Sequence, residues 1–309
     1  MSRILSLALV LAFAAAAGAA TARERQAAGP LSTVAVAGVD VSYADEYRHG
    51  CHEVRLWNVA TRSDRRIASH CFVSTSTGSG IADAIATQGR ALWLTYTGGN
   101  IREWSLWTKG GATTARRIAF LPADVDGPPP VILGSVWEGS LPYATGRTII
   151  VLAPNGSRRF TYTAADRVVF LSAHSRGYAA VLANGSVLTL SPAGKLIKER
   201  QFAPGAVQSA VLAAAGLIVE TAAGLEINGA ASVRTVPLPT NARFLGYSEG
   251  IAAYGLGREL RLRRLANGQD RLFRRLEPRF HAQLGRRGIA YGSGRTLGFS
   301  VWAIVSGAV

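Results

Sequence analysis

Five residues that can bind metals or form covalent bonds lie close together near the N-terminal end of the chain. They are His49, Cys51, His52, His70 and Cys71, and the chain has no other cysteine. Thiolates and imidazoles are ligands that zinc prefers, so a metal site is one chemistry open to this group. A disulfide is the other, because two cysteines pair readily in an oxidising compartment.

The residues between the two cysteines favour the disulfide. Strand-like runs flank a polar turn at 61–64, and Cys51 and Cys71 are equally distant from Thr61, so a hairpin sets them opposite each other. Facing residues of antiparallel strands are about 4.5–5.5 Å apart between Cα atoms, a separation that a disulfide spans. Closing such a loop stabilises a fold by about 3 kcal/mol on the chain-entropy model.

The same hairpin argues against zinc. Zinc ligands converge as a tetrahedron, whereas neighbours such as His70 and Cys71 point to opposite faces of a strand. Oxidation would also consume both sulfurs. We therefore expect a disulfide between Cys51 and Cys71, and we assign no metal ligand, cofactor-binding residue or catalytic residue.

No other motif in the sequence defines an active site. The glycines around Ser79 lack the spacing of a nucleophile elbow, and the chain has neither a phosphate-binding loop nor a His-Glu-x-x-His. Asp124 and Asp126 resemble a fragment of a calcium loop, but prolines follow where a later acidic ligand is needed, so we expect a turn. Glu138 and Asp166 are carboxylates without an identifiable partner.

Strand and turn signals dominate the chain after residue 22. Short apolar runs alternate with clusters of Gly, Asn, Pro and Asp, and helical periodicity is nearly absent. Asn-Gly pairs at 155–156, 184–185 and 267–268 predict hairpins, because such pairs tolerate positive φ angles. Two of the pairs also begin glycosylation sequons, which the turns explain without a glycan. The fold class is therefore all-β.

A phrase of strand, turn, strand and turn recurs seven times. Its anchors are Val34, Ala91, Pro142, Gly177, Gly216, Gly250 and Gly288. The mean spacing of about 42 residues is close to the ~40–45 of a four-stranded propeller blade. Sheets packed around an axis bury both faces, which a lone hairpin pair cannot do. We therefore predict a seven-bladed β-propeller, with loop insertions around Cys51 and at 124–130 explaining the longest spacings.

The two ends of the repeat region predict how the ring closes. The seventh repeat, at about 277–305, is one strand short of a blade. A strand at Leu31–Ala37 precedes the pattern of the first blade. We expect this N-terminal strand to pair with the last blade and close the ring.

One blade resembles a known family. The segment 53–67, EVRLWNVATRSDRRI, is similar to the outer hairpin of a WD-repeat blade, with Trp57-Asn58 where that repeat usually carries Trp-Asp. Trp104 and Trp107 echo the pattern, while the other blades lack the Trp-acid pair and the Gly-His element. The chain thus resembles β-propellers as a class. The resemblance implies a rigid scaffold that presents loops to partners.

The first 22 residues have the pattern of a signal peptide. Arg3 precedes an uncharged apolar run from Ile4 to Ala20, and the small-x-small sequence at 20–22 predicts cleavage after Ala22. The run is at the lower limit of a bilayer span and rich in alanine, which disfavours the alternative of an uncleaved anchor. We expect residues 23–309 to form one exported domain, secreted or in the cell envelope, without a transmembrane span.

The charge balance is strongly basic, with 34 Lys and Arg against 19 acidic residues and a net charge of +15. The arginines are spread along the chain and an exported protein rarely meets nucleic acid, so we expect no nucleic-acid partner. A basic surface suits anionic envelope polymers or lipid headgroups. We expect a monomeric, non-enzymatic propeller that binds a protein or an anionic envelope polymer through its loops. The alternative is an extracellular propeller hydrolase or lyase with catalytic residues at the channel mouth.

Overall fold

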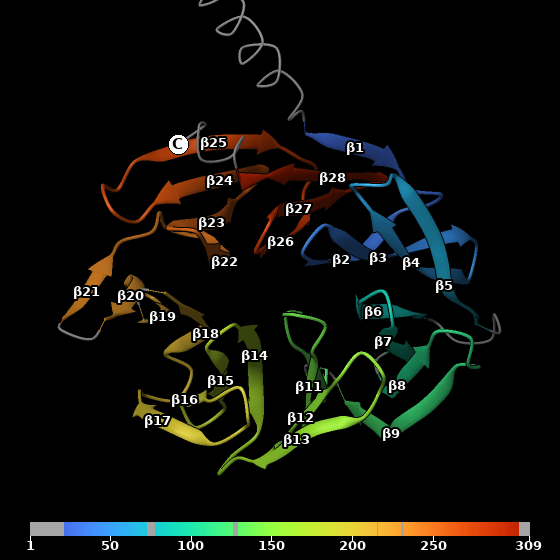
Figure 1. Cartoon of the computed structure of the whole chain (residues 1–309), viewed down its shortest axis with the longest axis horizontal. Helices are drawn as coiled ribbons and strands as arrows, with labels where there is room; N and C mark the ends of the chain where they lie inside the picture. The colour runs from blue at the N-terminus through green and yellow to red at the C-terminus, as the bar shows by residue number, and fades with distance from the viewer. Residues whose placement is uncertain are drawn as a thin grey trace, which may run out of the picture.

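The computed structural model describes residues 22–72, 78–99, 101–125, 129–214, 216–229 and 232–302. These residues form seven four-stranded antiparallel sheets, which are arranged around a central axis (Figure 1). The predicted all-β, seven-bladed propeller is confirmed. Within the described residues, no helix is long and apolar enough to cross a bilayer.

In six blades the strands follow chain order from the central channel outward. The first blade contains β2 (Leu31–Ala37), β3 (Asp40–Arg48), β4 (Cys51–Asn58) and β5 (Ser63–Cys71). The second contains β6 (Ser79–Ala86), β7 (Arg90–Thr97), β8 (Ile101–Gly110) and β9 (Arg116–Val125). The third contains β10 (Val131–Leu133), β11 (Leu141–Thr145), β12 (Thr148–Leu152) and β13 (Arg158–Thr163). The fourth contains β14 (Val168–His174), β15 (Gly177–Leu182), β16 (Ser186–Leu190) and β17 (Leu196–Gln201). The fifth contains β18 (Val207–Ala213), β19 (Gly216–Thr221), β20 (Gly224–Asn228) and β21 (Val233–Val236). The sixth contains β22 (Arg243–Ser248), β23 (Ile251–Leu256), β24 (Glu259–Arg264) and β25 (Asp270–Arg275).

The seventh blade combines strands from both ends of the chain. It contains β26 (His281–Gly285), β27 (Gly288–Ser293), β28 (Thr296–Val301) and β1 (Arg23–Gln26). Strand β1 is the outermost strand and pairs with β28, with Arg23 opposite Phe299 and Gln26 opposite Thr296. An N-terminal strand therefore closes the ring, as expected.

The prediction that Leu31–Ala37 is this closing strand was wrong. Leu31–Ala37 is β2, the inner strand of the first blade, and it pairs with β3 rather than with the last blade. Four consecutive buried residues in β2 suit a position enclosed by neighbouring blades, whereas β1 alternates between exposed and partly buried residues. A polar strand such as β1 fits the outer edge of a sheet, where one side meets water.

The extra length of the first two repeats lies largely in long strands, not in the loop insertions that we expected. Strands β8 and β9 have 10 residues each, and Cys51 begins the eight-residue strand β4. Asp124 is part of β9, while residues 126–128 lie outside the described residues. The anchor Val34 also lies on an inner strand, whereas the later anchors lie on or beside second strands, which lengthens the first spacing.

The three Asn-Gly pairs form the predicted hairpin turns. Gly156, Gly185 and Gly268 have φ angles of 86°, 87° and 71°. The Oδ1 atom of Asn155 accepts a hydrogen bond from the Ser157 backbone N–H at 2.9 Å, so the asparagine caps its own turn. Only the glycine of each pair has a positive φ, which fits a type I turn followed by a left-handed glycine.

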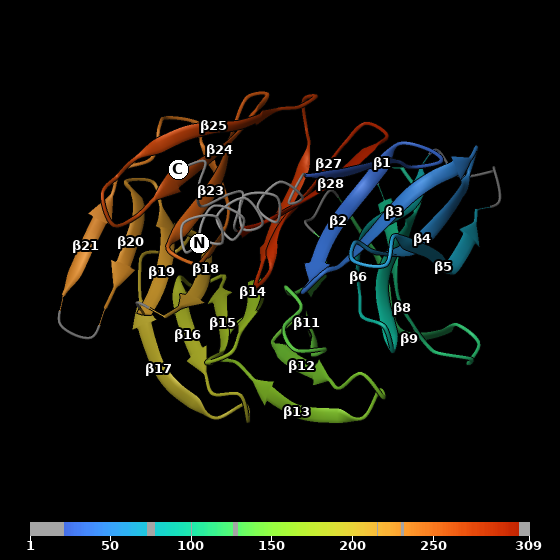
Figure 2. The same cartoon turned by 45° about the horizontal axis from the view of Figure 1, so that its top comes forward.

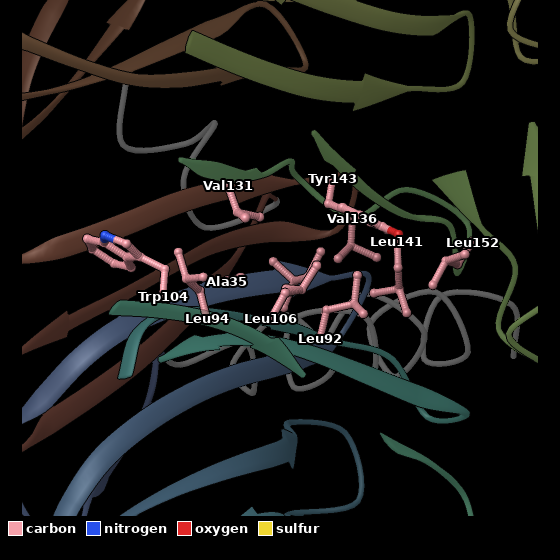
Figure 3. Close-up of a cluster of buried hydrophobic side chains, with 11 residues drawn as sticks. Ala35, Leu92, Leu94, Trp104, Leu106, Val131, Val136, Leu141, Tyr143 and Leu152 are labelled. Carbon is pink, nitrogen blue, oxygen red and sulfur yellow. The ribbon is translucent and has the colours of Figure 1, made fainter. Parts of the chain in front are cut away.

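Apolar side chains between neighbouring blades form the core. Figure 3 shows the cluster between the second and third blades, where Leu92 and Leu106 approach Val136 and Leu141. Equivalent clusters lie at the other blade interfaces. Each blade therefore depends on both neighbours for the burial of its two faces.

Candidate binding site at the channel mouth

Two kinds of turn leave the blades on one face of the ring. They join the first strand of a blade to the second and the third strand to the fourth. With the strands of each blade lettered A to D from the channel outward, we call this the A–B face and the opposite one the B–C face. Because every inner strand runs toward the A–B face, seven turns converge there around one mouth of the channel.

A cleft of about 370 Å³ opens at this mouth and is bounded by turns of the first, second, third and seventh blades. Its apolar lining includes Val136, Trp137 and Pro154, and its charged lining includes Glu138 and Arg286. The cleft thus offers an apolar surface with charges of both signs around it, a composition suited to binding.

A tight turn between β10 and β11 positions Trp137. The Ser140 backbone N–H donates a hydrogen bond to the Trp137 carbonyl at 2.8 Å. Glu138 and Gly139 have φ angles of 47° and 75°, in the left-handed region. A Cβ atom at Gly139 would lie 2.6 Å from Cγ of Pro154, so this position requires glycine both for its conformation and for its close packing.

The Trp137 indole packs on the ring of His174, which ends the inner strand β14. The ring centroids are 4.8 Å apart. Burial and the nearby Arg176 lower the pKa of His174, so its imidazole is neutral at pH 7. Its Nδ1 accepts a hydrogen bond from the Arg176 backbone N–H at 3.4 Å. The indole N–H of Trp137 is buried and has no acceptor among the described residues.

An ion pair joins two turns across the mouth. Oε1 of Glu138 and Nη1 of Arg286 are 3.8 Å apart, and both side chains are more than half exposed. Arg287, the next residue, is also exposed and lines the same cleft. An exposed pair of this length contributes little stability. Its partners are therefore free to exchange their contact for one with a charged ligand.

The channel below the mouth has a mixed lining of apolar and polar side chains. It encloses about 200 Å³, and its lining includes Leu245 from an inner strand together with Ser172, His174 and Tyr247. Burial raises the pKa of the Tyr247 hydroxyl, which accepts a hydrogen bond from the Gly250 backbone N–H at 3.1 Å. The charged side chains around the channel lie at the mouth on the A–B face.

The predicted disulfide is present, and it lies on the first blade, away from the channel mouth. Cys51 and Cys71 are opposite each other on β4 and β5, with their Cα atoms 4.1 Å apart, and their sulfurs are bonded. His52 and His70 form the neighbouring cross-strand pair, and burial lowers the pKa of both. No group of three or more His, Cys, Asp or Glu residues within the described ranges is arranged to hold a metal ion.

Of the acidic residues discussed in the sequence analysis, Glu138 lies at the mouth. Asp124 lies on the outer strand β9, and Asp166 lies in the turn before β14, where it accepts a hydrogen bond from the Arg167 backbone N–H at 2.7 Å. Sequence reasoning did not identify Trp137, His174 or Arg286 as site residues. Nothing in their local sequence marks them, because their proximity depends on how the blades are arranged around the ring.

The fold defines a seven-bladed β-propeller, and solved WD-repeat propellers are similar to it. The WD40 domain of Neurospora crassa Pan2 is 14% identical with a TM-score of 0.53, and the match covers 89% of this chain and 90% of that one. A chain of the Mitotic Checkpoint Complex is 14% identical with a TM-score of 0.57, and the match covers 90% and 91%. Raptor from Chaetomium thermophilum is 14% identical with a TM-score of 0.53, over 91% of this chain and 29% of that chain.

These likenesses confirm the resemblance to WD-repeat and other β-propellers at the level of the fold. This chain spans less than a third of the Raptor chain. No protein-family model matches the sequence, and no curated protein is detectably similar to it in sequence. The shared property is thus the ring of four-stranded blades.

Proposed function

We propose that this protein is an exported, monomeric and non-enzymatic scaffold that binds a protein or an anionic envelope polymer at the A–B mouth of its channel. The observation that carries the proposal is the cleft in which turns from four blades meet around Trp137. Tryptophan and arginine are the residue types that most often dominate binding energy. Here Trp137 lines the same cleft as Arg286 and Arg287.

The chemistry of the mouth supports binding more than catalysis. A general base must face the proton that it removes, whereas His174 lies against the Trp137 ring and accepts a hydrogen bond from its own turn. Glu138 and Arg286 form an exposed pair. In the channel beneath them, the Tyr247 hydroxyl already accepts a hydrogen bond from the Gly250 backbone N–H.

Two features support export. The sequence begins with a signal-peptide pattern that ends at Ala22. The Cys51–Cys71 disulfide is a bond that persists in oxidising compartments and is rare in the cytosol. Fractionation of cells that produce a C-terminally tagged chain tests this part. Recovery of the tagged protein in the cytosol with residues 1–22 retained contradicts it.

Site-specific photo-crosslinking in the producing cell tests the binding face. A photoreactive phenylalanine analogue replaces Glu138 on the A–B face or, as the matched control, the exposed Ala223 in a turn on the B–C face. We expect a discrete adduct from position 138 that is lost when Trp137→Ala is added. Equal adducts from both positions, or an adduct that does not depend on Trp137, contradict the proposal. Turnover of a small substrate that Glu138→Gln abolishes would favour the hydrolase or lyase.

A further inference from the structure

Two neighbouring outer strands expose large apolar side chains at the same end. Leu196 and Ile197 begin β17 in the fourth blade, and Val233 begins β21 in the fifth, at the left of Figures 1 and 2. Their exposed fractions are 45%, 61% and 57%. Each follows a turn of the A–B face, so the three residues belong to one side of the ring. We call this region the β17–β21 edge.

Other outer strands begin differently. Strands β9 and β13 each begin with two arginines, and β5 carries Arg65 and Arg66 near its start. Charged residues are the usual protection of an exposed strand edge. Strand β9 also exposes Phe120, at 48%, but only after its two arginines. The apolar start of β17 and β21 differs from the charged start of these strands, which points to contact with something other than water.

A groove of about 230 Å³ separates the two blades beside these residues. Ile197 lines it from β17, while Leu212 and Leu217 line it from the fifth blade. Arg176 and Lys198 also line the groove. The groove therefore combines an apolar wall with two cations, which suits a ligand that has both an apolar part and an anionic group.

Cations accompany the apolar residues on the two strands and along the groove. They are Lys195, directly before β17; Lys198 and Arg200 on β17; Arg234 on β21; and Arg176, which lines the groove. The acidic residues are Glu199 on β17 and Glu226, which is paired with Arg200. The edge thus has a net excess of cations over anions next to exposed hydrocarbon.

We propose that the β17–β21 edge docks on the surface of an anionic phospholipid bilayer. The apolar side chains protrude from the outer rim of the ring. A headgroup layer accepts protruding side chains to a depth of about 5–10 Å, whereas a folded protein needs a matching pocket. Lysines and arginines at the same edge attract the anionic lipids. The apolar residues of the edge lie on outer strands, whereas the partner proposed above binds at turns around the channel, so the two proposals are tested separately.

Co-sedimentation with vesicles tests the proposal. Vesicles of phosphatidylcholine with about 30% phosphatidylglycerol are compared with phosphatidylcholine alone. We expect binding to the anionic vesicles that weakens with salt. The double change Ile197→Ser and Val233→Ser should weaken it about tenfold. Lys198→Glu with Arg234→Glu should weaken it at least fivefold for each charge.

Matched controls separate the edge from the general basic charge. Ile101→Ser removes a side chain that is 57% exposed on the second blade, and Arg158→Glu with Arg159→Glu makes the same charge change on β13. These controls should reduce binding much less. Thermal unfolding checks that every variant is folded.

Three results overturn the proposal. The first is equal binding to neutral and anionic vesicles, or to neither. The second is an equal loss in the control variants, which would assign binding to the charge of the whole ring. The third is binding of dextran sulfate as tight as that of the anionic vesicles and unaffected by the Ile197→Ser and Val233→Ser changes, which would identify a soluble polyanion as the partner.

Discussion

The innermost and outermost strands of the blades differ sharply in charge. Among Lys, Arg, Asp and Glu, the seven inner strands contain only Asp83 and Arg243. The seven outer strands contain 14 basic and five acidic residues, and so contribute much of the net charge of +15. One structural repeat therefore places opposite kinds of surface at its two edges.

This difference follows from what each strand touches. An inner strand is enclosed by two neighbouring blades and the channel, so a charge there loses its hydration. Asp83 shows the consequence: burial raises its pKa, and it accepts hydrogen bonds from the Thr33 hydroxyl and the Ala84 backbone N–H, both at 2.8 Å. An outer strand has a free edge, which like charges keep from pairing with another molecule.

The largest expected effect on stability concerns a leucine buried between blades, compared with a leucine on an outer strand. Leu92 is fully buried between blades, whereas Leu196 is 45% exposed on an outer strand. Leu92→Ala should lower the free energy of unfolding by about 3–4 kcal/mol, because it leaves a cavity. Leu196→Ala should change it by less than about 1 kcal/mol. Urea denaturation of both variants measures this, and equal losses would contradict the division into core and rim.

The disulfide is expected to have the next largest effect. It joins β4 to the outer strand β5, which has only one neighbouring strand in its sheet. Cys51→Ser with Cys71→Ser should lower the free energy of unfolding by about 3 kcal/mol. Guanidinium denaturation of the variant and of the reduced wild type measures this. A variant as stable as the oxidised protein would show that β5 is held by its other contacts alone.

Acid should weaken the ring through the histidines of its inner strands. Burial and Arg243 lower the pKa of His281 on β26. The unfolded chain then binds a proton below about pH 6.5 that the folded chain resists, so stability falls as the pH drops. Thermal unfolding between pH 7.5 and about 5 should show a smaller loss for His281→Gln than for the wild type. His49→Gln, at a fully exposed side chain, should leave the loss unchanged.

The smallest effect on stability, and the sharpest test of edge protection, concerns β13. Arg158 and Arg159 are both exposed at its start. Changing both to Ser should alter the free energy of unfolding by less than about 0.5 kcal/mol while increasing self-association at low salt. Light scattering measures this. The control, Arg48→Ser with Arg258→Ser, removes the same charge from the end of β3 and from the turn before β24, both at the B–C face, and should not promote association.

Local patterns predicted much of the fold. The Asn155-Gly156 turn and the facing of Cys51 and Cys71 each depend on residues less than about two dozen positions apart, so the sequence contains all the information that they need. Ring closure is different. Both β1 and β2 lie near the N-terminus, and only the packing of β2 between blades shows which of them can be the outer strand.

The site could not be predicted in this way. Glu138 and Arg286 lie in turns of the third and seventh blades, and the sequence offers no pattern that links them. Likewise, Trp137 meets His174 only because the turn after β10 crosses toward the next blade's inner strand. Such contacts depend on the number of blades and on the position of each turn around the ring.

The sequence by itself determined the strands, their turns, the blade count and the register of the disulfide hairpin, because hydrophobic alternation and turn chemistry act between near neighbours in the chain. Only the tertiary structure decided which N-terminal strand completes the seventh blade and which side chains share the channel mouth. These depend on closing a ring, and closure brings together residues more than a hundred positions apart whose local sequences are independent of one another.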